Sequence, residues 1–408
     1  MTIKALFPTV RPSLNLDFAK TKALDPRVTF TRASTATFVG ADGLIKTAAS
    51  GVPRFDHNPT TGESLGLLVE EARTNDFSYS SGFDQSAWTK LDLNAIPNSA
   101  LAPDGTLTAF KLAPNATETS HRLQRVIGGS TPSIFTIYLK AGEYTTCDIY
   151  SINPDFGARI NLTNGTLSTS SDSPLSAKPA TGISVQPVGN GWYRVAIPGR
   201  NSTNINNPIQ IAPLRYGSFA GDGTSGIFAW GAQLEPASFP TSYIPTTGST
   251  VTRAADVASM TGTNFSSWYR QDEGTLFIRY KQYANQGGWR GIFSGGSGNT
   301  FPALQTNNTG GTAQAWTQTY EASTSINITL AQGQQHKVAI GHKITSGLSI
   351  AIDGGNPSSI SYNVAQSTAT TINFTQGYYS EVNNQHISRF AFYPVRLPDA
   401  QFQALTAT

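Results

Sequence analysis

Residues 226–257 read GIFAWGAQLEPASFPTSYIPTTGSTVTRAADV, and this stretch contains the most informative change of pattern in the chain. Its first ten residues are a run of aromatic and aliphatic side chains, which is typical of a buried β-strand. Residues 236–250 carry three prolines. They predict an extended linker held down by Phe239 and Tyr243. The sequence therefore predicts that one β-rich domain ends and another begins between Pro236 and Asp256.

The composition of the whole chain supports an all-β fold. Of the 408 residues, 38% are hydrophobic, 10% are aromatic and only 13% are charged, and there are 38 glycines and 23 prolines. An ordinary soluble domain has about 25% charged residues. The aromatic content argues against disorder, and the long helix-forming runs that a coiled coil or helical solenoid needs are missing.

Candidate strands lie on both sides of the linker, between clusters of turn-forming residues. This is the pattern of a β-sandwich, and it predicts two antiparallel sandwiches in sequence. One short helix is predicted over residues 397–407, where Phe402 and Leu405 share a face. The predicted strands are residues 135–142, 146–152, 191–198 and 226–235 before the linker, and 274–280, 291–295, 336–341, 348–354 and 386–395 after it.

Residues 1–75 differ from the rest, because they are short extended pieces separated by tight turns at Asp42-Gly43 and Thr61-Gly62. A core built from these pieces alone would be thin. We therefore expect them to pack against the next domain, another subunit or a larger assembly. One short motif occurs both in this segment and just after the linker: TRAS at residues 31–34 is similar to TRAA at residues 252–255. We call this similarity the TRAS and TRAA echo.

Charge, cysteine count and the amino terminus exclude several classes of protein. The net charge of +3 is spread evenly, without the basic stripe that nucleic-acid binding requires. Cys147 is the single cysteine, so intramolecular disulfides and cysteine-based zinc sites are excluded. The amino terminus, MTIKALFPTVRP, has no signal-peptide core, and no apolar run approaches the ~20 residues of a membrane helix. We expect no nucleic-acid partner, no membrane insertion and no export signal.

Several motifs resemble those of bacteriophage virion appendage proteins, and the resemblance covers nearly the whole chain. Motifs that resemble a carbohydrate-binding-module-like jelly roll are SAWTK (86–90), APDGTLTAFKL (102–112), FTIYLKAG (135–142) and GNGWYRVAI (189–197). Those that resemble a concanavalin A/laminin-G-like sandwich and its closing helix are residues 266–280, 336–343, 348–355 and 387–406. PSLNLDFA (12–19), TFTRASTATFVGADG (29–43) and GLLVEEARTN (66–75) resemble segments that precede such domains in phage structural proteins.

This resemblance implies three parts of the chain and a role for each. Residues 1–75 are the expected anchoring or assembly segment, residues 76–245 the jelly roll, and residues 246–408 the second sandwich. The implied protein is a non-enzymatic fibre or spike on the phage tail or head, which presents its sandwiches to a host surface glycan. The expected partners are other virion proteins through residues 1–75, host surface polysaccharide and further copies in a homotrimer, and the expected location is the virion surface.

Two other functions stay open at this point. One is a purely architectural decoration or baseplate component that binds only virion proteins. The other is a capsular polysaccharide depolymerase, although neither a hydrolase motif nor a clear pair of acids is visible. The adjacent Asp272 and Glu273 would point to opposite faces of a strand, which makes them a poor acid–base pair. No catalytic residue is predicted.

The candidate ligand residues are aromatic, because the apolar face of a sugar ring stacks on aromatic side chains while amides bind its hydroxyls. In AQAWTQTYE, Trp316, Gln318 and Tyr320 alternate onto one face with no aliphatic residue beside them. Trp289 and Arg290 lie in the glycine-rich GGWRG, which predicts an exposed loop. These five residues are the predicted glycan contacts. The alternatives for the first three are an oligomer contact or an ordinary polar strand.

The other four tryptophans have apolar neighbours or lie near domain starts. Trp192 and Trp230 are predicted to pack in cores, and Trp88 and Trp268 to close them.

Metal binding has little support from the sequence, and no cofactor is predicted. His336 and His342 share a strand face, but at ~3.3 Å per residue they stand roughly 20 Å apart, too far for one ion. Asp222 in AGDGTSG and Asp353 in IDGG fit either calcium loops or glycine-assisted turns. Calcium is therefore the one ion left open, and no metal ligand is assigned.

Overall fold

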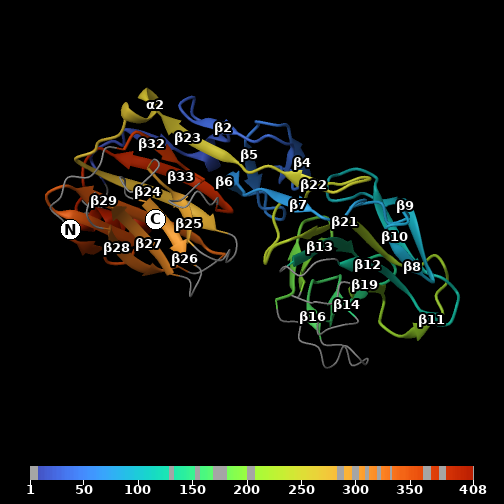
Figure 1. Ribbon diagram of the computed structural model, residues 1–408. Helices are drawn as coiled ribbons and strands as arrows, with labels where there is room; N and C mark the ends of the chain where they lie inside the picture. Colours follow the sequence, from blue (N-terminus) through green and yellow to red (C-terminus); the bar gives the residue numbers. More distant parts are fainter. Residues whose placement is uncertain are drawn as a thin grey trace.

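The computed structural model describes residues 8–127, 133–151, 157–168, 182–199, 207–282, 289–295, 303–307, 312–318, 323–330, 333–361, 369–375 and 383–407. Over these ranges the chain forms antiparallel β-sheets and three short helices, arranged as two lobes (Figure 1). The predicted fold class, all-β with two antiparallel sandwiches, is confirmed. In the described part of the chain, no helix is long and apolar enough to cross a membrane.

The middle sandwich consists of two six-stranded sheets, with strand orders β17-β18-β13-β21-β10-β9 and β16-β15-β14-β19-β12-β8. A small pair, β11 (Thr119–Ser120) and β20 (Ser218–Phe219), lies beside them. The strands of the first sheet are β9 (Leu93–Ala100), β10 (Ala109–Pro114), β13 (Ser133–Lys140), β17 (Ser184–Pro187), β18 (Trp192–Gly199) and β21 (Ile227–Glu235). Those of the second are β8 (Thr89–Leu91), β12 (Arg122–Ile127), β14 (Thr146–Ser151), β15 (Gly157–Asn161), β16 (Leu167–Ser168) and β19 (Asn207–Pro213).

Strand β13 shows why this sandwich is stable, because it is buried on both faces. Phe135, Ile137 and Leu139 point into the core between the sheets. Tyr138 points the other way and packs against Trp230 and Tyr243, in an outer cluster that also contains Trp192. The core positions predicted for Trp192 and Trp230 are confirmed, and so is the burial of Trp88 between the sheets and of Trp268 in the other sandwich.

The second sandwich is built around an eight-stranded sheet of order β31-β30-β29-β24-β33-β6-β5, with β1 paired to β33 as well. Its opposing layer contains a four-stranded sheet, β25-β26-β27-β28, and a three-stranded sheet, β2-β23-β32. The large sheet comprises β1 (Leu14–Leu16), β5 (Arg54–His57), β6 (Ser64–Val69), β24 (Glu273–Gln282), β29 (Gln335–Lys343), β30 (Gly347–Ile352), β31 (Ser358–Ile360) and β33 (Gln385–Tyr393). The opposing layer comprises β2 (Thr29–Thr31), β23 (Val257–Thr261), β25 (Trp289–Phe293), β26 (Ala303–Asn307), β27 (Thr312–Gln318), β28 (Ser323–Thr329) and β32 (Thr371–Asn373).

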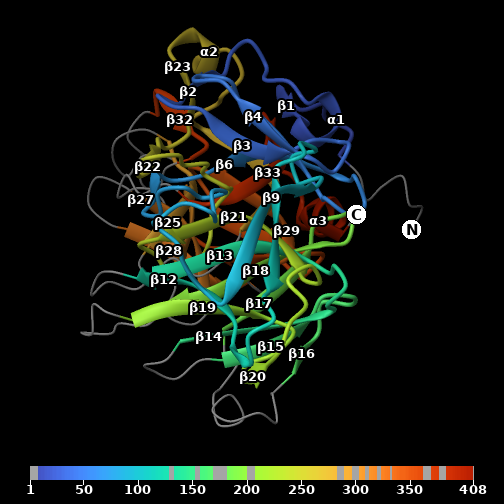
Figure 2. The ribbon, with the colours of Figure 1, turned by 90° about the vertical axis from the view of Figure 1, so that its right-hand side faces the viewer.

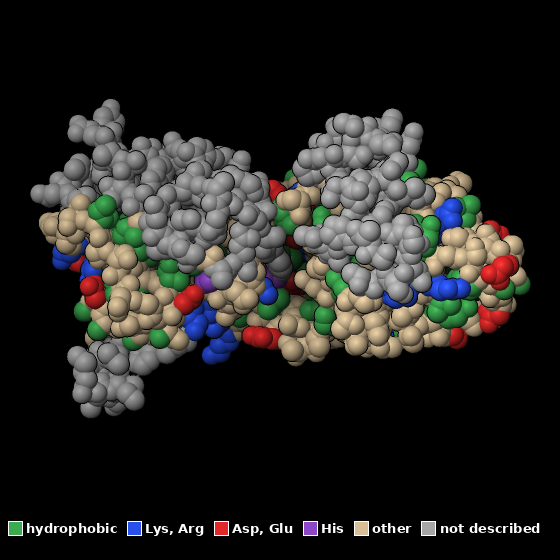
Figure 3. Space-filling model, turned by 90° about the horizontal axis from the view of Figure 1, so that it is seen from below, with side chains coloured by type: hydrophobic (Ala, Val, Ile, Leu, Met, Phe, Trp, Pro, Cys, Tyr) green, Lys and Arg blue, Asp and Glu red, His purple; other side chains and the backbone are tan. Residues whose placement is uncertain are grey.

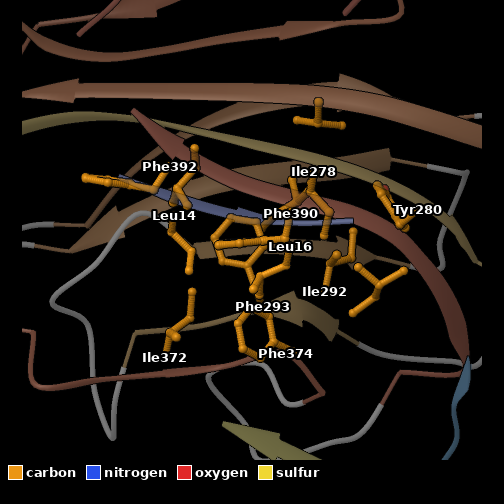
Figure 4. Packing of buried hydrophobic residues seen from close by; sticks show 14 of the residues in the cluster. Leu14, Leu16, Ile278, Tyr280, Ile292, Phe293, Ile372, Phe374, Phe390 and Phe392 are labelled. Carbon is orange, nitrogen blue, oxygen red and sulfur yellow. The ribbon is translucent and has the colours of Figure 1, made fainter. Parts of the chain in front are cut away.

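Side chains alternate along β33 between two apolar clusters. Phe390 and Phe392 enter the core between the layers, where Figure 4 shows them beside Leu14, Leu16 and Ile278. Ala391 and Tyr393 face the other way and are covered by helix α3 (Asp399–Ala407). The predicted closing helix is confirmed, with Phe402 and Leu405 buried against the sheet.

Residues 1–75 contribute to sheet and core in a way that the local sequence does not reveal. Strands β1 and β6 both pair with β33, which lies near the opposite end of the chain. Helix α1 (Phe18–Thr21) buries Phe18 in the same core. The sequence division treats residues 1–75 as a separate anchoring segment. In the structure β1, β5 and β6 belong to the large sheet of the second sandwich and β2 to its opposing layer, so this segment packs against later parts of the chain as expected.

The middle sandwich is therefore inserted into the second one. The chain leaves through β7 (Arg73–Asn75) and returns through β22 (Val251–Arg253), and these two strands pair with each other. Between β21 and β22, residues 236–250 contain no helix or strand, and Phe239 and Tyr243 are buried, as predicted for the residues that hold the linker down. Figure 2 looks onto the middle sandwich, with the hairpin of β3 (Ala36–Val39) and β4 (Ile45–Ala48) above its sheets. In that hairpin the Ile45 N–H donates to the Pro103 carbonyl at 3.0 Å.

A buried histidine in the second sandwich gives a prediction about acid stability. His342 in β29 lies beside the rings of Tyr269 and Phe392, and α2 (Thr263–Ser266) precedes Tyr269. Burial lowers the pKa of His342 to about 4, against ~6.5 in an unfolded chain. The unfolded state binds the proton more readily. The stability linked to the neutral His342 is therefore fully present above about pH 6.5 and is lost as the pH falls towards 4.

We expect the free energy of unfolding to fall by about 2–3 kcal/mol between pH 7.5 and 4.5 through this residue. Urea unfolding at both pH values, for the natural chain and for His342→Gln, measures it. The variant should show a pH dependence that is weaker by this amount. An equal pH dependence in both chains would show that His342 is not the titrating group.

Candidate functional site

A cleft of about 680 Å³ lies where the two sandwiches meet. Its walls come from β5, β6, β24 and β33 on one side and from β13, β17 and β18 on the other, and the linker closes it through Phe239, Pro240 and Tyr243. Figure 3 shows the recess between the two lobes, with charged side chains of both signs around it. Both sandwiches therefore build the cleft together.

A network of buried ion pairs, which we call the junction network, lies next to the cleft. It consists of Arg32, Arg54, Glu70, Arg253 and Asp256, whose side chains are at most 3% exposed. Arg54 donates to Glu70 at 2.7 Å and to Asp256 at 2.5 Å, Arg32 donates to Asp256 at 3.0 Å, and Arg253 lies 2.8 Å from Glu70. The network ties segments of residues 1–75 to residues 253–256, where the chain returns from the insertion.

Neighbouring opposite charges keep Glu70 and Arg54 ionised despite their burial. Burial alone would raise the pKa of Glu70, but Arg253 and Arg54 bring it well below its usual value, helped by hydrogen bonds from Ser242. Burial likewise disfavours the charged form of Arg54, and the carboxylates of Glu70 and Asp256 outweigh this and raise its pKa. Ser242 is a linker residue, so the network also holds the linker in place.

The echo between TRAS and TRAA has a structural meaning. Arg32 of the first motif and Arg253 of the second enter the same network from opposite ends of the insertion. Arg32 also donates to the carbonyls of Ala49 and Val52, and Arg253 donates to the carbonyl of Glu71. The repeated arginine marks the two chain segments that meet at the junction.

Besides Glu70, the Asp56 carboxylate and two histidines line the part of the cleft formed by the second sandwich. The Asp56 carboxylate accepts the Val39 N–H at 2.6 Å and lies 2.7 Å from Nε2 of His386. Nδ1 of His57 lies 3.1 Å from the Val39 carbonyl, which can only accept, so Nδ1 carries the proton. Nε2 of His57 has no hydrogen-bond partner among the described residues, although the side chain is almost fully buried.

Two cations also line the cleft, one from each sandwich. Arg194 of β18 donates through Nη2 to the Thr241 carbonyl at 2.6 Å, and its guanidinium lies 5.7 Å from the centre of the Tyr138 ring. Lys281 of β24 lies opposite, next to His386 in the sheet. Among the residues that the structure describes, neither cation forms an ion pair.

The residues predicted to contact glycan lie away from this cleft, in the four-stranded sheet of the second sandwich. Trp316 and Gln318 belong to β27, where Trp316 pairs with Ala303 and Ser325. Trp289 and Arg290 begin β25 and pair with Asn307 and Thr306. The prediction of a loop at GGWRG is therefore wrong for Trp289 and Arg290, because these residues are paired within a β-sheet. Tyr320 lies outside the described residues.

Of the two candidate calcium residues, Asp222 makes contacts within its own turn, whereas Asp353 bonds to residues of β29. Asp222 accepts the N–H groups of Thr224 and Ser225 at 2.8 and 2.6 Å, as in the glycine-assisted turn that was the alternative. Asp353 accepts the Lys337 N–H at 2.8 Å and lies 2.6 Å from Nδ1 of His336. Within the described ranges, no three His, Cys, Asp or Glu residues are grouped closely enough to hold a metal ion.

The cleft could not be predicted from the sequence, because its lining comes from many short and distant segments. Asp56 and His386 are separated by 330 residues, and Arg194 lies in the inserted sandwich. The only local signal was the TRAS and TRAA echo, which marks the network behind the cleft.

Comparisons with known proteins give distant matches in fold. No protein-family model matches the chain, and no curated protein matches it. Among solved structures, the CBM40 of the Ruminococcus gnavus IT-sialidase bound to α2,3-sialyllactose matches with 14% identity and a TM-score of 0.31, over 36% of this chain and 88% of that one. A structure described as a receptor binding domain matches with 12% identity and a TM-score of 0.32, over 37% of this chain.

A botulinum neurotoxin type C structure matches with 11% identity and a TM-score of 0.31, over 37% of this chain. The match spans 39% of that toxin chain and 39% of the receptor binding domain structure.

Proposed function

We propose that the protein is a non-enzymatic structural component of a phage virion, a fibre or spike of the tail or head, which recognises a host surface glycan. The cleft between the two sandwiches is the observation that carries the proposal. Its volume lies in the range of about 300–1,000 Å³ that is typical of small-molecule sites. It would therefore hold a short stretch of saccharide rather than a single ion.

The lining of the cleft suits a saccharide. Hydroxyl and amide side chains such as Thr60 and Gln186 stand beside apolar surfaces such as Pro187 and Val188. Sugars present the same combination, since their hydroxyls need hydrogen-bond partners and their C–H faces need apolar contact. The junction network and the linker fix both walls, which lowers the entropy cost of ordering the site on binding.

The contacts of the two cleft carboxylates support binding rather than hydrolysis. A glycosidase needs one carboxyl group that holds a proton and a second that acts as base or nucleophile. Glu70 is held ionised by Arg54 and Arg253. Asp56 is bonded through both oxygens, to Val39 and His386. Neither group is placed to donate a proton to a glycosidic oxygen.

The virion part of the proposal rests on the motifs that resemble phage appendage proteins. In it, residues 1–75 attach the protein to other virion proteins through surfaces that the second sandwich leaves uncovered, and three copies assemble. A homotrimer would present three clefts to a repetitive polysaccharide. Binding at several sites at once would raise the overall affinity even if each site binds weakly. The protein would then be found on the virion surface.

Binding to an array of bacterial surface polysaccharides by the full chain tests the proposed function. We expect retention of at least one polysaccharide without release of shorter products. No binding to any member would contradict glycan recognition and would favour the architectural alternative. Release of shortened oligosaccharides would contradict the non-enzymatic part and favour a depolymerase.

The same array tests the aromatic residues predicted from the sequence as a second contact surface. An aromatic platform contributes about 1–1.5 kcal/mol per stacked ring, which corresponds to roughly a tenfold loss of affinity when the ring is removed. Trp316→Ala and Trp289→Ala should each cause this loss with little change in melting temperature. Unchanged binding by both variants would leave the cleft as the only proposed site.

A further inference from the structure

The charged groups of the cleft differ in whether their bonding capacity is already used within the protein. Both cleft carboxylates are used, since Glu70 accepts from Arg54 and Ser242, and Asp56 accepts from Val39 and pairs with His386. The cleft therefore offers a ligand few charged acceptors.

In contrast, two positively charged side chains of the cleft keep hydrogen-bonding capacity that the protein does not use. Arg194 donates through Nη2 to Thr241, with a longer contact to Thr136, and its positive charge has no carboxylate partner among the described residues. Lys281 has no ion pair within the described ranges, and its ammonium group can donate three hydrogen bonds. Unused donors that line a partly enclosed cleft favour a ligand rich in acceptors.

The two cations come from different sandwiches, and this placement narrows the class of ligand. Arg194 belongs to β18 of the middle sandwich and Lys281 to β24 of the second. The planar guanidinium binds a carboxylate through two parallel hydrogen bonds, and the lysine ammonium adds a compact positive charge. A ligand that satisfies both must carry negative charge and reach both walls of the cleft.

We propose that the cleft binds an acidic saccharide, a chain that contains carboxylate-bearing sugars such as uronic acids, with Arg194 and Lys281 as the groups that select the carboxylate. This inference rests on the proposed function and names the chemical class of its ligand. Binding would join the two sandwiches through one ligand. The neutral parts of the sugar would contact Pro187, Val188 and the hydroxyl and amide groups of the lining.

The test uses the full chain and matched pairs of probes. These are oligosaccharides of galacturonate or glucuronate, and the same oligosaccharides after reduction of each carboxyl group to a primary alcohol. Calorimetric titration should show binding of the acidic member at least tenfold tighter than that of its reduced partner. Because the attraction is between charges, raising the salt from 50 to 500 mM should weaken only the acidic member.

Two variants identify the groups responsible. Lys281→Gln and Arg194→Gln should each weaken binding of the acidic probe roughly tenfold and leave the reduced probe unchanged. Arg194→Lys should restore part of the loss, because it keeps the charge but not the planar pair of donors. Lys140→Gln is the matched control, since Lys140 is a half-buried strand lysine outside the cleft, and it should bind like the natural chain.

Each outcome has one meaning. Equal binding of the acidic and reduced probes, or full binding by Lys281→Gln and Arg194→Gln, would overturn the acidic-saccharide inference while leaving glycan binding in place. Binding of neither member of any pair, together with an empty polysaccharide array, would overturn the proposed function and this inference with it. Tighter binding of the acidic probes by the natural chain, lost in both variants, would support the proposed function and the acidic-saccharide inference.

Discussion

Replacing Asp256 by Asn is expected to lower the free energy of unfolding by about 3–5 kcal/mol, since removing one partner of a buried ion pair leaves the other charge uncompensated. Asp256 is fully buried and accepts hydrogen bonds from Arg32, Arg54 and the Glu70 N–H. The amide has nearly the same shape, so the effect measures charge rather than packing. Urea unfolding at pH 7 gives the difference.

Asp272→Asn provides the control for this experiment. Asp272 pairs with Arg270, and both side chains are about half exposed. An exposed pair of this kind contributes about 0–1 kcal/mol. If Asp256→Asn cost no more than Asp272→Asn, the junction network would not be holding the two chain segments together.

The second large effect concerns the carboxy-terminal part of the chain when it is separated from the amino-terminal strands. A fragment of residues 246–408 lacks β1, α1, β2, β5 and β6. It therefore loses six buried side chains of its core: Leu14, Leu16, Phe18, Val28, Leu67 and Val69. At about 1.5–3 kcal/mol for each buried side chain, the loss is roughly 9–18 kcal/mol. Because whole domains are stable by only about 5–15 kcal/mol, we expect no cooperative unfolding transition in calorimetry.

A fusion of residues 8–75 to residues 236–408 is the matched control. The two ends are close together, because the Asp76 N–H donates to the Leu234 carbonyl at 2.8 Å and β7 pairs with β22. A short glycine–serine linker should therefore restore a cooperative transition. A fragment of residues 246–408 that melted at the temperature of the full chain would show that the amino-terminal strands are dispensable for this sandwich.

Local patterns were enough to predict most strands and the closing helix. Strands β13, β21, β24 and β33 are long apolar runs, so their hydrophobic side chains alone determine that they are buried. The turn at Asp42-Gly43 needed only the left-handed backbone of Gly43, whose φ is 76°. The linker without helix or strand followed from its prolines.

Pairing between distant segments could not be predicted in this way. Strand β1 has three residues, and nothing in them specifies β33 as the partner. The junction network was hidden for a different reason, since Arg54, Glu70 and Asp256 look like ordinary surface charges until the fold buries them together. The same holds for Arg194 and Lys281, which become neighbours of one cleft only through the insertion.

The pairing of β1 and β6 with β33 also sets the order of events during synthesis. The middle sandwich is complete once residue 235 has been made, so it can fold while the ribosome is still working. The early strands must wait for β33, and the distance is long, since Asp56 of β5 and His386 of β33 are 330 residues apart. At about 5–20 residues per second, the delay is roughly 15–65 s. During that time the Leu67 and Val69 side chains and the open edge of β6 have no native cover. In the newly made chain, Leu67 and Val69 therefore wait longer for their native neighbours than the core residues of the middle sandwich do.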